Sequence, residues 1–320
     1  MRSEFKLIQE YFTHPTPATN LGVGDDCALI SPTLGMELAI STDLLVAEQH
    51  FLPNTNPYDL GCKSASVNLS DCAAMGAQPR WATLGLALPE VREEWIAAFA
   101  AGFHDTLSAH GADWVGGDTT AGPLTIAVTI LGEAPTGTAL RRSGAVVGDD
   151  IWVSGTVGDA ALGLQVLLGQ LKVTDEDRAL LVARLERPTA RVALGLALRG
   201  LAHAAIDVSD GLLADLGHML DASGVGAEIL WEAIPLSPAA LRARQSARWQ
   251  EAVLSGGDDY ELCFSAARSD ADAVLQAAAR AGVPVTRIGS MVAAGLRLVR
   301  DGHGNPMTVS WHGFDHFSRP

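Results

Sequence analysis

The feature that most constrains the fold is a long helix of small apolar residues with one polar side. Asn56 can cap this helix and Pro57 suits its first position, and apolar residues recur at helical spacing from there to Met75. Asn68 and Asp71 are three residues apart, so both project from the same side. The pattern predicts a buried helix with one functional face, although Asp71 taken alone is better explained as a hydrogen-bonded residue near a helix end.

Length and composition predict a globular protein of two domains. Of the 320 residues, 48% are hydrophobic and 18% are charged, far from the composition of disordered chains. The net charge of −15 argues against nucleic acid or an anionic membrane surface as a partner. An anionic small molecule can still bind where metal cations separate it from the carboxylates.

The ends of the chain and its cysteines predict the compartment. No stretch is long and apolar enough for a transmembrane helix, and the start MRSEFKLIQEYF lacks the apolar core of a signal peptide. The four cysteines include no CxxC pair, so reduced, packed thiols are expected rather than disulfides or a zinc site. We therefore expect a cytoplasmic protein.

In the first half of the chain, acidic and hydroxyl residues stand where apolar strands begin or end. The motif GDD at 24–26 precedes a short apolar strand, although a simple turn is the favoured explanation of this motif alone. The strand MELAISTD is expected to end in Ser41, Thr42 and Asp43, whose oxygens suit a hard cation. A helix N-cap is the alternative for Ser41 or Thr42.

Two more positions of the first half carry polar side chains next to apolar strands. Asp118 follows two glycines, and two short strands are expected around Gly116–Thr120. His50 lies in a loop before Pro53, where a lone histidine is usually just solvated.

The second half begins with a fresh strand, IWVSG, and we place a domain boundary near residue 145. In AIDVSDGLLADLGHML a short strand runs into a helix that Ser209 or Asp210 can cap, and Asp207 and Asp210 are close enough to share an ion. Further on, SGGDDYEL places Asp258 between two apolar segments. The chain is expected to be α+β (mixed α/β), with domains at 1–145 and 146–320.

The motifs of common nucleotide-binding and hydrolytic enzymes are missing, and a dispersed set of aspartates remains. The sequence contains no GxxxxGK[ST] loop, no protein-kinase set, no GxSxG and no HExxH. Six aspartates near turns share a context of apolar strands, glycines and hydroxyls: Asp26, Asp43, Asp71, Asp118, Asp207 and Asp210. Brought together, they would repel one another unless divalent cations lay between them.

Hard oxygen ligands favour Mg²⁺ over zinc or copper, and several Mg²⁺ ions on an acidic wall suit a polyphosphate. Arg142 and the backbone N–H groups around Gly117 could hold phosphate oxygens directly.

An ordered series of motifs also carries a family resemblance over nearly the whole chain. The motifs are GVGDDCALI, AISTDLLVAEQHFLP, VNLSDCAAMGAQP, VGGDTT, ALRRSG, IDVSDGL, SGGDDYELCF and the closing WHGFDHF. In this order they resemble the thiamine-monophosphate kinase family, part of the superfamily of aminoimidazole ribonucleotide synthetase. The resemblance implies ATP-dependent phosphorylation of thiamine monophosphate to thiamine diphosphate, and a homodimer built by the N-terminal domains with ATP between the domains of each subunit.

The resemblance also implies roles for single residues. Metal ligands, direct or through water, would be Asp26, Ser41, Thr42, Asp43, Asp71, Asp118, Asp207 and Asp210. Contacts to ATP would come from Gly117, Asp118, Arg142 and Ser209, and the thiamine substrate would face His50, Asp258 and Phe314. The family more often has Glu at the position of Asp258, and this shorter carboxylate would need a water molecule to reach the same group.

The implied mechanism needs no strong general base, because a phosphomonoester with a second pKa of about 6 is already largely ionised near neutral pH. Bringing two polyanions together in line is the obstacle, and Mg²⁺ ions remove it by neutralising charge and fixing geometry.

Two alternatives are weaker. Selenophosphate synthetase requires a reactive residue in a Gly-rich N-terminal arm, and residues 1–21 contain neither Cys nor Gly. A Ca²⁺-binding protein would carry a local loop such as DxDxDG, which the sequence lacks.

Overall fold

The computed structural model describes residues 4–311 and Gly313, and the chain divides into two compact units. Unit 1 comprises residues 1–72 and 77–137, and unit 2 comprises residues 73–76 and 138–320. Each unit has its own β-sheet, so the expected mixed α/β fold class is confirmed. None of the helices within the described residues is long and apolar enough to cross a bilayer.

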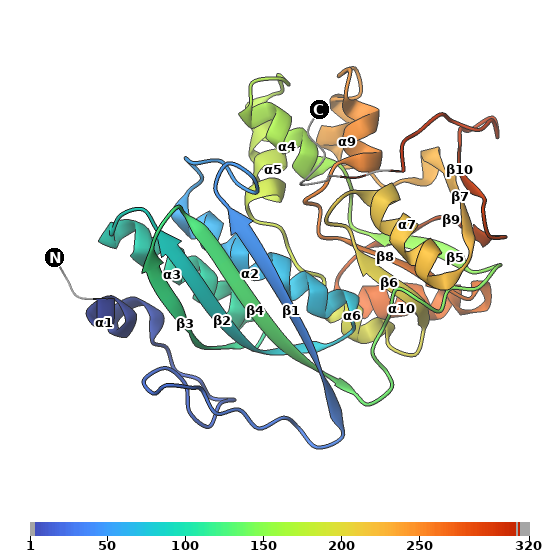
Figure 1. Cartoon of the computed structure of the whole chain (residues 1–320). Coiled ribbons are helices and arrows are strands. Elements are labelled where there is room, and N and C mark those ends of the chain that lie inside the picture. The colour runs from blue at the N-terminus through green and yellow to red at the C-terminus, as the bar shows by residue number, and fades with distance from the viewer. Residues whose placement is uncertain (1–3, 312, 314–320) are drawn as a thin grey trace. The chain divides into compact units, whose positions relative to one another are not determined.

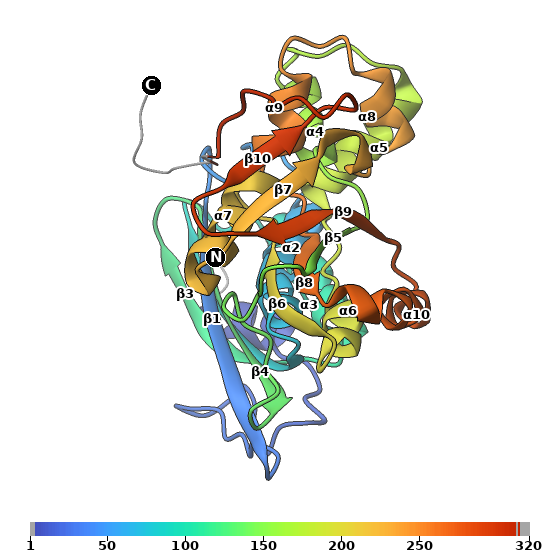
Figure 2. The same ribbon diagram turned by 90° about the vertical axis from the view of Figure 1, so that its right-hand side faces the viewer.

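Unit 1 is a four-stranded sheet with helices α2 and α3 on one face (Figures 1 and 2). The strand order is β1-β4-β2-β3, with β4 antiparallel to both neighbours and β2 parallel to β3. The two helices approach closely because Gly61 and Gly102 face each other's backbones, where an added Cβ would lie 2.1 Å from the Phe99 carbonyl oxygen and 2.0 Å from that of Tyr58. The elements of this unit are α1 (Glu4–Leu7), the π-helical turn η1 (Ile8–Phe12), β1 (Met36–Val46), α2 (Pro57–Ala74), β2 (Gln78–Leu88), α3 (Glu93–Ala109), β3 (Asp113–Ala121) and β4 (Thr125–Pro135).

The long helix predicted from the sequence is α2, and its start and burial are confirmed. The Asn56 side-chain oxygen accepts hydrogen bonds from the backbone N–H groups of Tyr58 and Asp59, at 2.9 and 3.4 Å. Leu69 and Asn68 are both fully buried. A buried polar residue on such a helix needs a hydrogen-bond partner, and the Asn68 side chain makes two hydrogen bonds, as described below.

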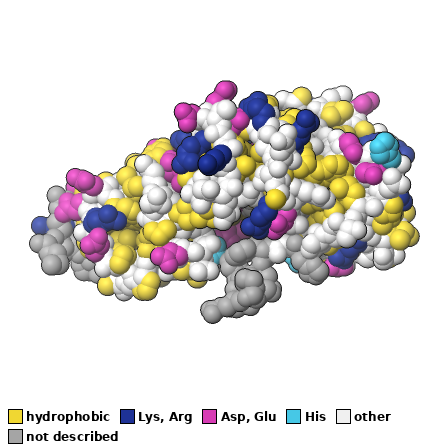
Figure 3. All heavy atoms as spheres, turned by 90° about the horizontal axis from the view of Figure 1, so that it is seen from above, with side chains coloured by type: hydrophobic (Ala, Val, Ile, Leu, Met, Phe, Trp, Pro, Cys, Tyr) yellow, Lys and Arg dark blue, Asp and Glu magenta, His cyan; other side chains and the backbone are white. Residues whose placement is uncertain are grey.

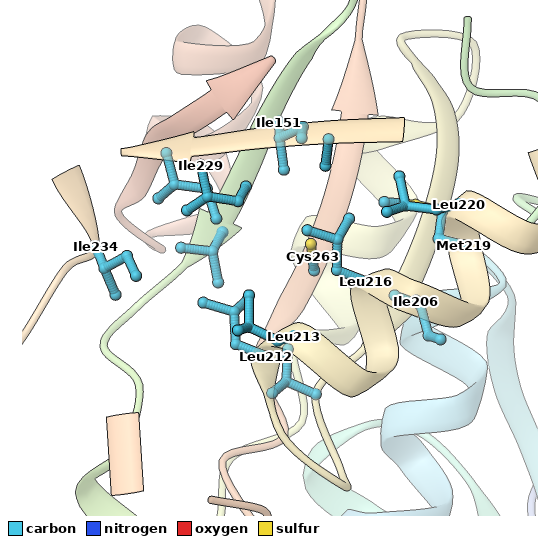
Figure 4. Close-up of a cluster of buried hydrophobic side chains, with 14 of the residues drawn as sticks. Ile151, Ile206, Leu212, Leu213, Leu216, Met219, Leu220, Ile229, Ile234 and Cys263 are labelled. Atoms are coloured by element: carbon cyan, nitrogen blue, oxygen red, sulfur yellow. The ribbon is translucent and has the colours of Figure 1, made fainter. Parts of the chain in front are cut away.

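Unit 2 is a six-stranded mixed sheet in the order β10-β7-β9-β5-β8-β6. Helix α7 packs its apolar side on this sheet: Leu213 and Leu216 point toward Ile151 on β5 and Cys263 on β8 in a closed cluster (Figure 4). The elements of this unit are β5 (Asp150–Ser154), α4 (Asp159–Leu167), α5 (Asp175–Glu186), α6 (Val192–Leu198), β6 (Ala202–Asp207), α7 (Leu212–Ser223), β7 (Gly226–Leu230), η2 (Trp231–Ala233), α8 (Pro238–Arg242), α9 (Trp249–Ser255), β8 (Leu262–Ala266), η3 (Arg268–Asp270), α10 (Ala271–Ala281), β9 (Val285–Val292) and β10 (Arg297–Arg300).

Several sequence-based expectations about unit 1 are wrong. Strand β1 does not end at Asp43 but continues to Val46, because its polar residues can pair with β4 as readily as apolar ones. Strand β3 runs without a break through Gly116–Thr120, where two short strands were expected. The apolar stretch after the GDD motif makes only an isolated bridge between Leu29 and Leu21. Cys27 is exposed rather than packed.

Candidate functional site

In unit 1, the polar side of α2 meets strand β1. The Asp43 backbone N–H donates to Oδ1 of Asn68 at 3.3 Å, and Nδ2 of Asn68 donates to the Ser64 carbonyl oxygen at 3.1 Å. Asp71 lies three residues further along the same helix and is half-buried. Burial raises the pKa of the neighbouring Cys72 to about 12, and the charge of Asp71 contributes to this rise. The structure therefore brings Asp43 and the Asp71 side of α2 into one neighbourhood, with Asn68 as the link.

The three oxygen-bearing residues of β1 do not share a face. Ser41 and Asp43 pair with the buried Ile130 and Val128 of β4, so their side chains lie on the face that α2 and α3 cover. Thr42 points to the other face, where its hydroxyl lies 2.8 Å from the Thr129 hydroxyl. The side chains of Ser41 and Asp43 can serve one ion, whereas that of Thr42 is turned away from it.

His50 lies in the turn that follows β1. Its Nδ1 accepts a hydrogen bond from the Val46 backbone N–H at 3.0 Å. The neutral ring consequently carries its proton on Nε2. This bond fixes the ring at the end of the strand that also carries Asp43.

Gly117 and Asp118 lie on β3, at the opposite edge of the sheet from β1. Gly117 has a φ of +154°, and a Cβ there would come 1.9 Å from the Leu84 carbonyl oxygen, so only glycine fits. Asp118 is exposed and stands in register with Gly85, one row away from Asp43. Three strand spacings separate the two aspartates, roughly 14 Å. One chain does not bring Asp118 beside Asp43.

Asp26 is exposed in a bend, and its N–H donates to the Asp25 side chain at 2.8 Å. This is the local geometry of a turn, as favoured for the motif alone.

In unit 2, two loops that carry predicted site residues are joined by backbone hydrogen bonds. Asp207 ends β6, and the following loop reaches α7 at Gly211. The Asp258 N–H donates to the Ser209 carbonyl oxygen and the Tyr260 N–H to that of Val208, both at 2.8 Å. The structure therefore brings Asp207, Ser209 and Asp210 next to the loop of Asp258.

Asp258 itself has an unusual backbone. Its φ is +70° and that of Tyr260 is +50°, a region that non-glycine residues rarely adopt. The Tyr260 hydroxyl donates to Oδ1 of Asp258 at 3.3 Å. Strained residues of this kind persist only where their surroundings hold them, and they concentrate at functional sites.

Two buried acids outside the predicted site residues hold this loop. Asp259 accepts hydrogen bonds from the Gly158 and Ala160 N–H groups, at 2.6 and 3.4 Å, and burial raises its pKa well above the usual value. Glu261 is fully buried and pairs with Arg184 and Arg191. Asp259 and Glu261, two residues apart, are thereby both anchored to the interior, and the signal for this in the sequence is the acid spacing itself.

Asp215 is a third acid that sequence reasoning missed. It is 3% exposed, and its Oδ2 accepts the N–H groups of Ser209, Asp210 and Gly211, each at 3.0 Å. Burial, followed by the charges of Asp207 and Asp210, raises its pKa to about 8. The predicted helix cap from Ser209 or Asp210 is wrong: the N-cap residue is Gly211, and Asp215 reaches back to it. An acid in the first turn of a helix was the available signal.

Arg142 is exposed, and its carbonyl oxygen accepts the Ser223 hydroxyl at 3.1 Å, which ties its loop to the end of α7. Near the C-terminus, Trp311 packs against the core of unit 2, and a Cβ on Gly313 would lie 2.4 Å from the Asp210 carbonyl oxygen. The expectation that the tail packs against the protein is met at these two positions, while Phe314 lies outside the described residues.

The donor set suits a hard divalent cation, because Asp207 and Asp210 concentrate negative charge on oxygen atoms at one place. Within residues 4–311, however, no three His, Cys, Asp or Glu side chains converge closely enough to hold a metal without further ligands. On the face shown in Figure 3, acidic and basic side chains are interspersed rather than gathered by sign. A cation here would need phosphate oxygens or water to complete its shell.

Two family models match the chain, one in each unit. The AIR synthase related protein N-terminal domain matches residues 24–134, and the C-terminal domain of the same family matches residues 146–301. Together they cover most of the described chain.

Named relatives and solved structures match at full length. The chain is 49% identical over 326 aligned residues to the thiamine-monophosphate kinase of Salmonella typhimurium, covering 99% of both chains. A crystal structure of thiamine-monophosphate kinase from Stenotrophomonas maltophilia K279a is 44% identical, with a TM-score of 0.85 and 95% coverage of both chains. The solved structure "AaThiL complexed with AMPPCP and TMP" is 30% identical, with a TM-score of 0.78 and 99% coverage of both.

Proposed function

Because the chain belongs to the AIR synthase related proteins and, within them, to the thiamine-monophosphate kinase family, we propose that the acidic residues of both units serve one reaction. The enzyme transfers a phosphoryl group from ATP to thiamine monophosphate and forms thiamine diphosphate. It is thus a kinase whose acceptor is itself a phosphate group. The observation that carries this conclusion is the identity of 49% over 99% of the chain.

Mg²⁺ is the proposed metal, and the residues fit it. Asp43 and Asp71 would hold it in unit 1, and Asp207 and Asp210 in unit 2. The remaining proposed ligands are Asp26, Ser41, Thr42 and Asp118, of which Thr42 would reach an ion only through water or its backbone, given the side-chain direction described above. When bound, Mg²⁺ neutralises charge between two polyanions and fixes their line of approach.

The protein's own groups would position the reactants rather than move protons. The acceptor oxygen is already largely ionised near neutral pH, since the second pKa of a phosphomonoester is about 6. Arg142 would donate to a phosphate oxygen of ATP, and the backbone N–H groups around Gly117 would hold further phosphate oxygens. Ser209 would donate its hydroxyl to ATP. No general base is assigned.

The thiamine end of the acceptor is proposed to meet His50, Asp258 and Phe314. Because Nδ1 of His50 accepts the Val46 N–H, the ring would donate to the substrate through Nε2–H. The strained backbone at Asp258 supports a functional role, since the surrounding anchors hold it there.

A homodimer is supported by the uncovered face of the unit 1 sheet. Alternate residues of β1, namely Met36, Leu38, Ile40 and Leu44, are apolar and 36–63% exposed on this face. A second copy of the chain would cover this stripe. Since Asp43 and Asp118 lie on opposite edge strands, a second copy is also the means by which Asp118 of one subunit would reach the site of the other.

Residues 1–145 would form the dimerisation and metal-binding domain, and residues 146–320 the domain that completes the nucleotide and substrate site. The cytoplasm, where ATP is abundant, is the proposed location.

Product analysis with ATP, Mg²⁺ and thiamine monophosphate tests this function, with free thiamine as a parallel acceptor. We expect thiamine diphosphate only from the monophosphate. ADP without thiamine diphosphate would retain the ATP site and point to a sister synthetase. Neither product, from folded protein, would contradict the kinase activity.

A further inference from the structure

The loop between β6 and α7 is held by a single buried oxygen atom. Oδ2 of Asp215 accepts three consecutive backbone N–H groups, those of Ser209, Asp210 and Gly211, each at 3.0 Å. Asp215 is the fourth residue of α7, and its own N–H donates to the Gly211 carbonyl oxygen at 3.0 Å, the first helical bond. The carboxylate thus reaches back over the helix start, as the acid of a capping box does.

The last of these N–H groups belongs to the N-cap residue Gly211, at the helix end that commonly binds phosphate directly, and the other two lie just before it. The first N–H groups of a helix have no intrahelical partner, and they attract anions. Here a carboxyl oxygen of Asp215 occupies the N–H groups of Ser209, Asp210 and Gly211. Ser209 and Asp210 can therefore reach a phosphate only through their side chains or through a cation.

The other side of the loop is held by the segment that carries Asp258. The Asp258 N–H donates to the Ser209 carbonyl oxygen at 2.8 Å. A Cβ on Gly257 would come 2.3 Å from the same carbonyl oxygen, so the two segments are in closest contact there. The backbone of Ser209 and Asp210 has no freedom to adjust without breaking bonds on one side or the other.

We propose that Asp215 is a positioning residue that sets the backbone of Ser209 and Asp210, so that their side chains meet the metal-bound phosphates of ATP. Asp215 acts as an acceptor of hydrogen bonds and does not touch the reactants. This inference rests on the proposed function, because it concerns the same nucleotide site.

Two substitutions of Asp215 test whether its accepting oxygen atom is what matters. Asp215→Asn keeps an oxygen that can accept the three N–H groups, whereas Asp215→Ala leaves them unpaired. Titration calorimetry with Mg²⁺ and AMPPCP, a non-hydrolysable ATP analogue, measures nucleotide binding directly. We expect Asp215→Ala to weaken this binding by about 10- to 100-fold, as losses of supporting residues around metal sites do. Asp215→Asn should stay within about threefold of wild type, since it restores the hydrogen bonds.

A matched control removes a buried aspartate of the same unit that holds no site loop. Asp177 is 3% exposed, lies in the first turn of α5 and pairs with Arg242. Asp177→Ala should lower the melting temperature but leave AMPPCP affinity within about twofold. Equal loss of affinity in Asp177→Ala and Asp215→Ala would reduce the role of Asp215 to general stability and overturn the proposal.

A second pair of variants covers the case in which Asp215→Ala does not fold. Gly257→Ala would push the same loop from its other side, whereas Gly217→Ala in α7 meets only the flexible Arg297 side chain, at 3.4 Å. Weakened AMPPCP binding in Gly257→Ala but not in Gly217→Ala is expected. Wild-type affinity in Gly257→Ala, or in Asp215→Ala, would overturn the proposal, as would a loss in Asp215→Asn as large as in Asp215→Ala. Because wild type is assayed for thiamine diphosphate in parallel, a failed kinase assay would be distinguished from a failed role for Asp215.

Discussion

In unit 2, Asp210 and Asp258 lie on two loops that backbone hydrogen bonds join, whereas in unit 1 Asp43, Asp71 and Asp118 lie on a strand, a helix and a second strand. The unit 2 loops are irregular, but hydrogen bonds and ion pairs of the buried Asp215, Asp259 and Glu261 hold them in place. The three unit 1 acids stand on regular elements, with Asp43 near the Asp71 side of α2 and Asp118 at the opposite edge of the sheet.

The difference teaches where the cost of assembling the site falls. Ordering a loop costs conformational entropy, about 1–2 kcal/mol per residue, and in unit 2 the protein meets this cost on folding. In unit 1 the elements are fixed and Asp118 lies apart from Asp43, so only an ion, a phosphate chain or a second subunit can connect these two carboxylates. Unit 1 variants should therefore fail in ligand-dependent steps, and unit 2 variants in stability as well as function.

The largest effect is expected from neutralising the acids at the α2–β1 contact. Asp43→Asn and Asp71→Asn should each lower kcat by about 10²- to 10³-fold, because a charge that stabilises the transition state is lost. The fold should be retained, since the buried Asn68 and its bonds are untouched. Asp105→Asn, on the exposed side of α3, is the control. Near-wild-type turnover in both variants would contradict the metal assignment.

Mixed dimers test whether the separated acids of unit 1 meet across subunits. Asp43→Asn and Asp118→Asn chains, co-expressed with different tags and purified as a mixed pair, should regain about half of the wild-type activity, because one of two sites is then intact. A pair of Asp43→Asn and Asp71→Asn should regain none, since both positions lie on the same side of one chain. Absence of recovery in the first pair would place Asp118 in the same subunit's site, and failure of the tags to co-purify would contradict the dimer.

In unit 2, loss of the buried anchor should show as instability. Glu261→Ala removes the counter-charge of Arg191 and one counter-charge of Arg184, which also lies 4.0 Å from Asp159. Breaking comparable buried pairs costs about 3–5 kcal/mol. Denaturant unfolding measures this loss. Glu251→Ala removes the exposed pair with Arg248 and should cost less than about 1 kcal/mol. Similar losses in the two variants would show that the Glu261 pairs are no stronger than a surface contact.

Sequence patterns predicted the parts of the molecule that local chemistry decides. Helix α2 was recognisable because cap, first-turn proline and apolar spacing all agree, and the positions of Asp207 and Asp210 followed from a strand running into a helix. The residues that make up each of these features lie close together in the sequence, so a local pattern is enough to reveal them. The mixed α/β class followed from the same signals.

The parts that could not be predicted depend on contacts between distant residues. Strand β1 continues past Asp43 because β4, some 85 residues later, pairs with it to the end. The separation of Asp43 from Asp118 follows from strand order, which no local pattern contains. The role of Asp215 is different, because it lies only four to six residues from the N–H groups that it accepts, and the acid in the first turn of α7 was a local signal for it.

Strand β3 offers a smaller test of how rigid the unit 1 elements must be. Gly117→Ala would place a methyl group 1.9 Å from the Leu84 carbonyl oxygen at a φ of +154°, so β3 must shift or strain. The expected cost is about 1–3 kcal/mol in unfolding free energy, with weaker ATP binding. Gly116→Ala, next to it, meets no atom within 4 Å and should change stability by less than about 0.5 kcal/mol. Equal stability of the two variants would contradict the close contact between β2 and β3.

The smallest effect is expected at His50, which holds the end of β1 and is proposed to contact the substrate. Its Nδ1 accepts the Val46 N–H, so a hydrogen bond from the ring to thiamine monophosphate would come from Nε2–H. Loss of one such bond is worth about 0.5–1.5 kcal/mol, and His50→Ala should therefore raise KM for thiamine monophosphate by about three- to tenfold with little change in kcat. KM for ATP should not move, and His218→Ala on the exposed side of α7 should change neither. A fall in kcat with both KM values unchanged would mean that His50 acts in the transition state, in which case unit 1 would contribute more than ligand binding to the chemistry.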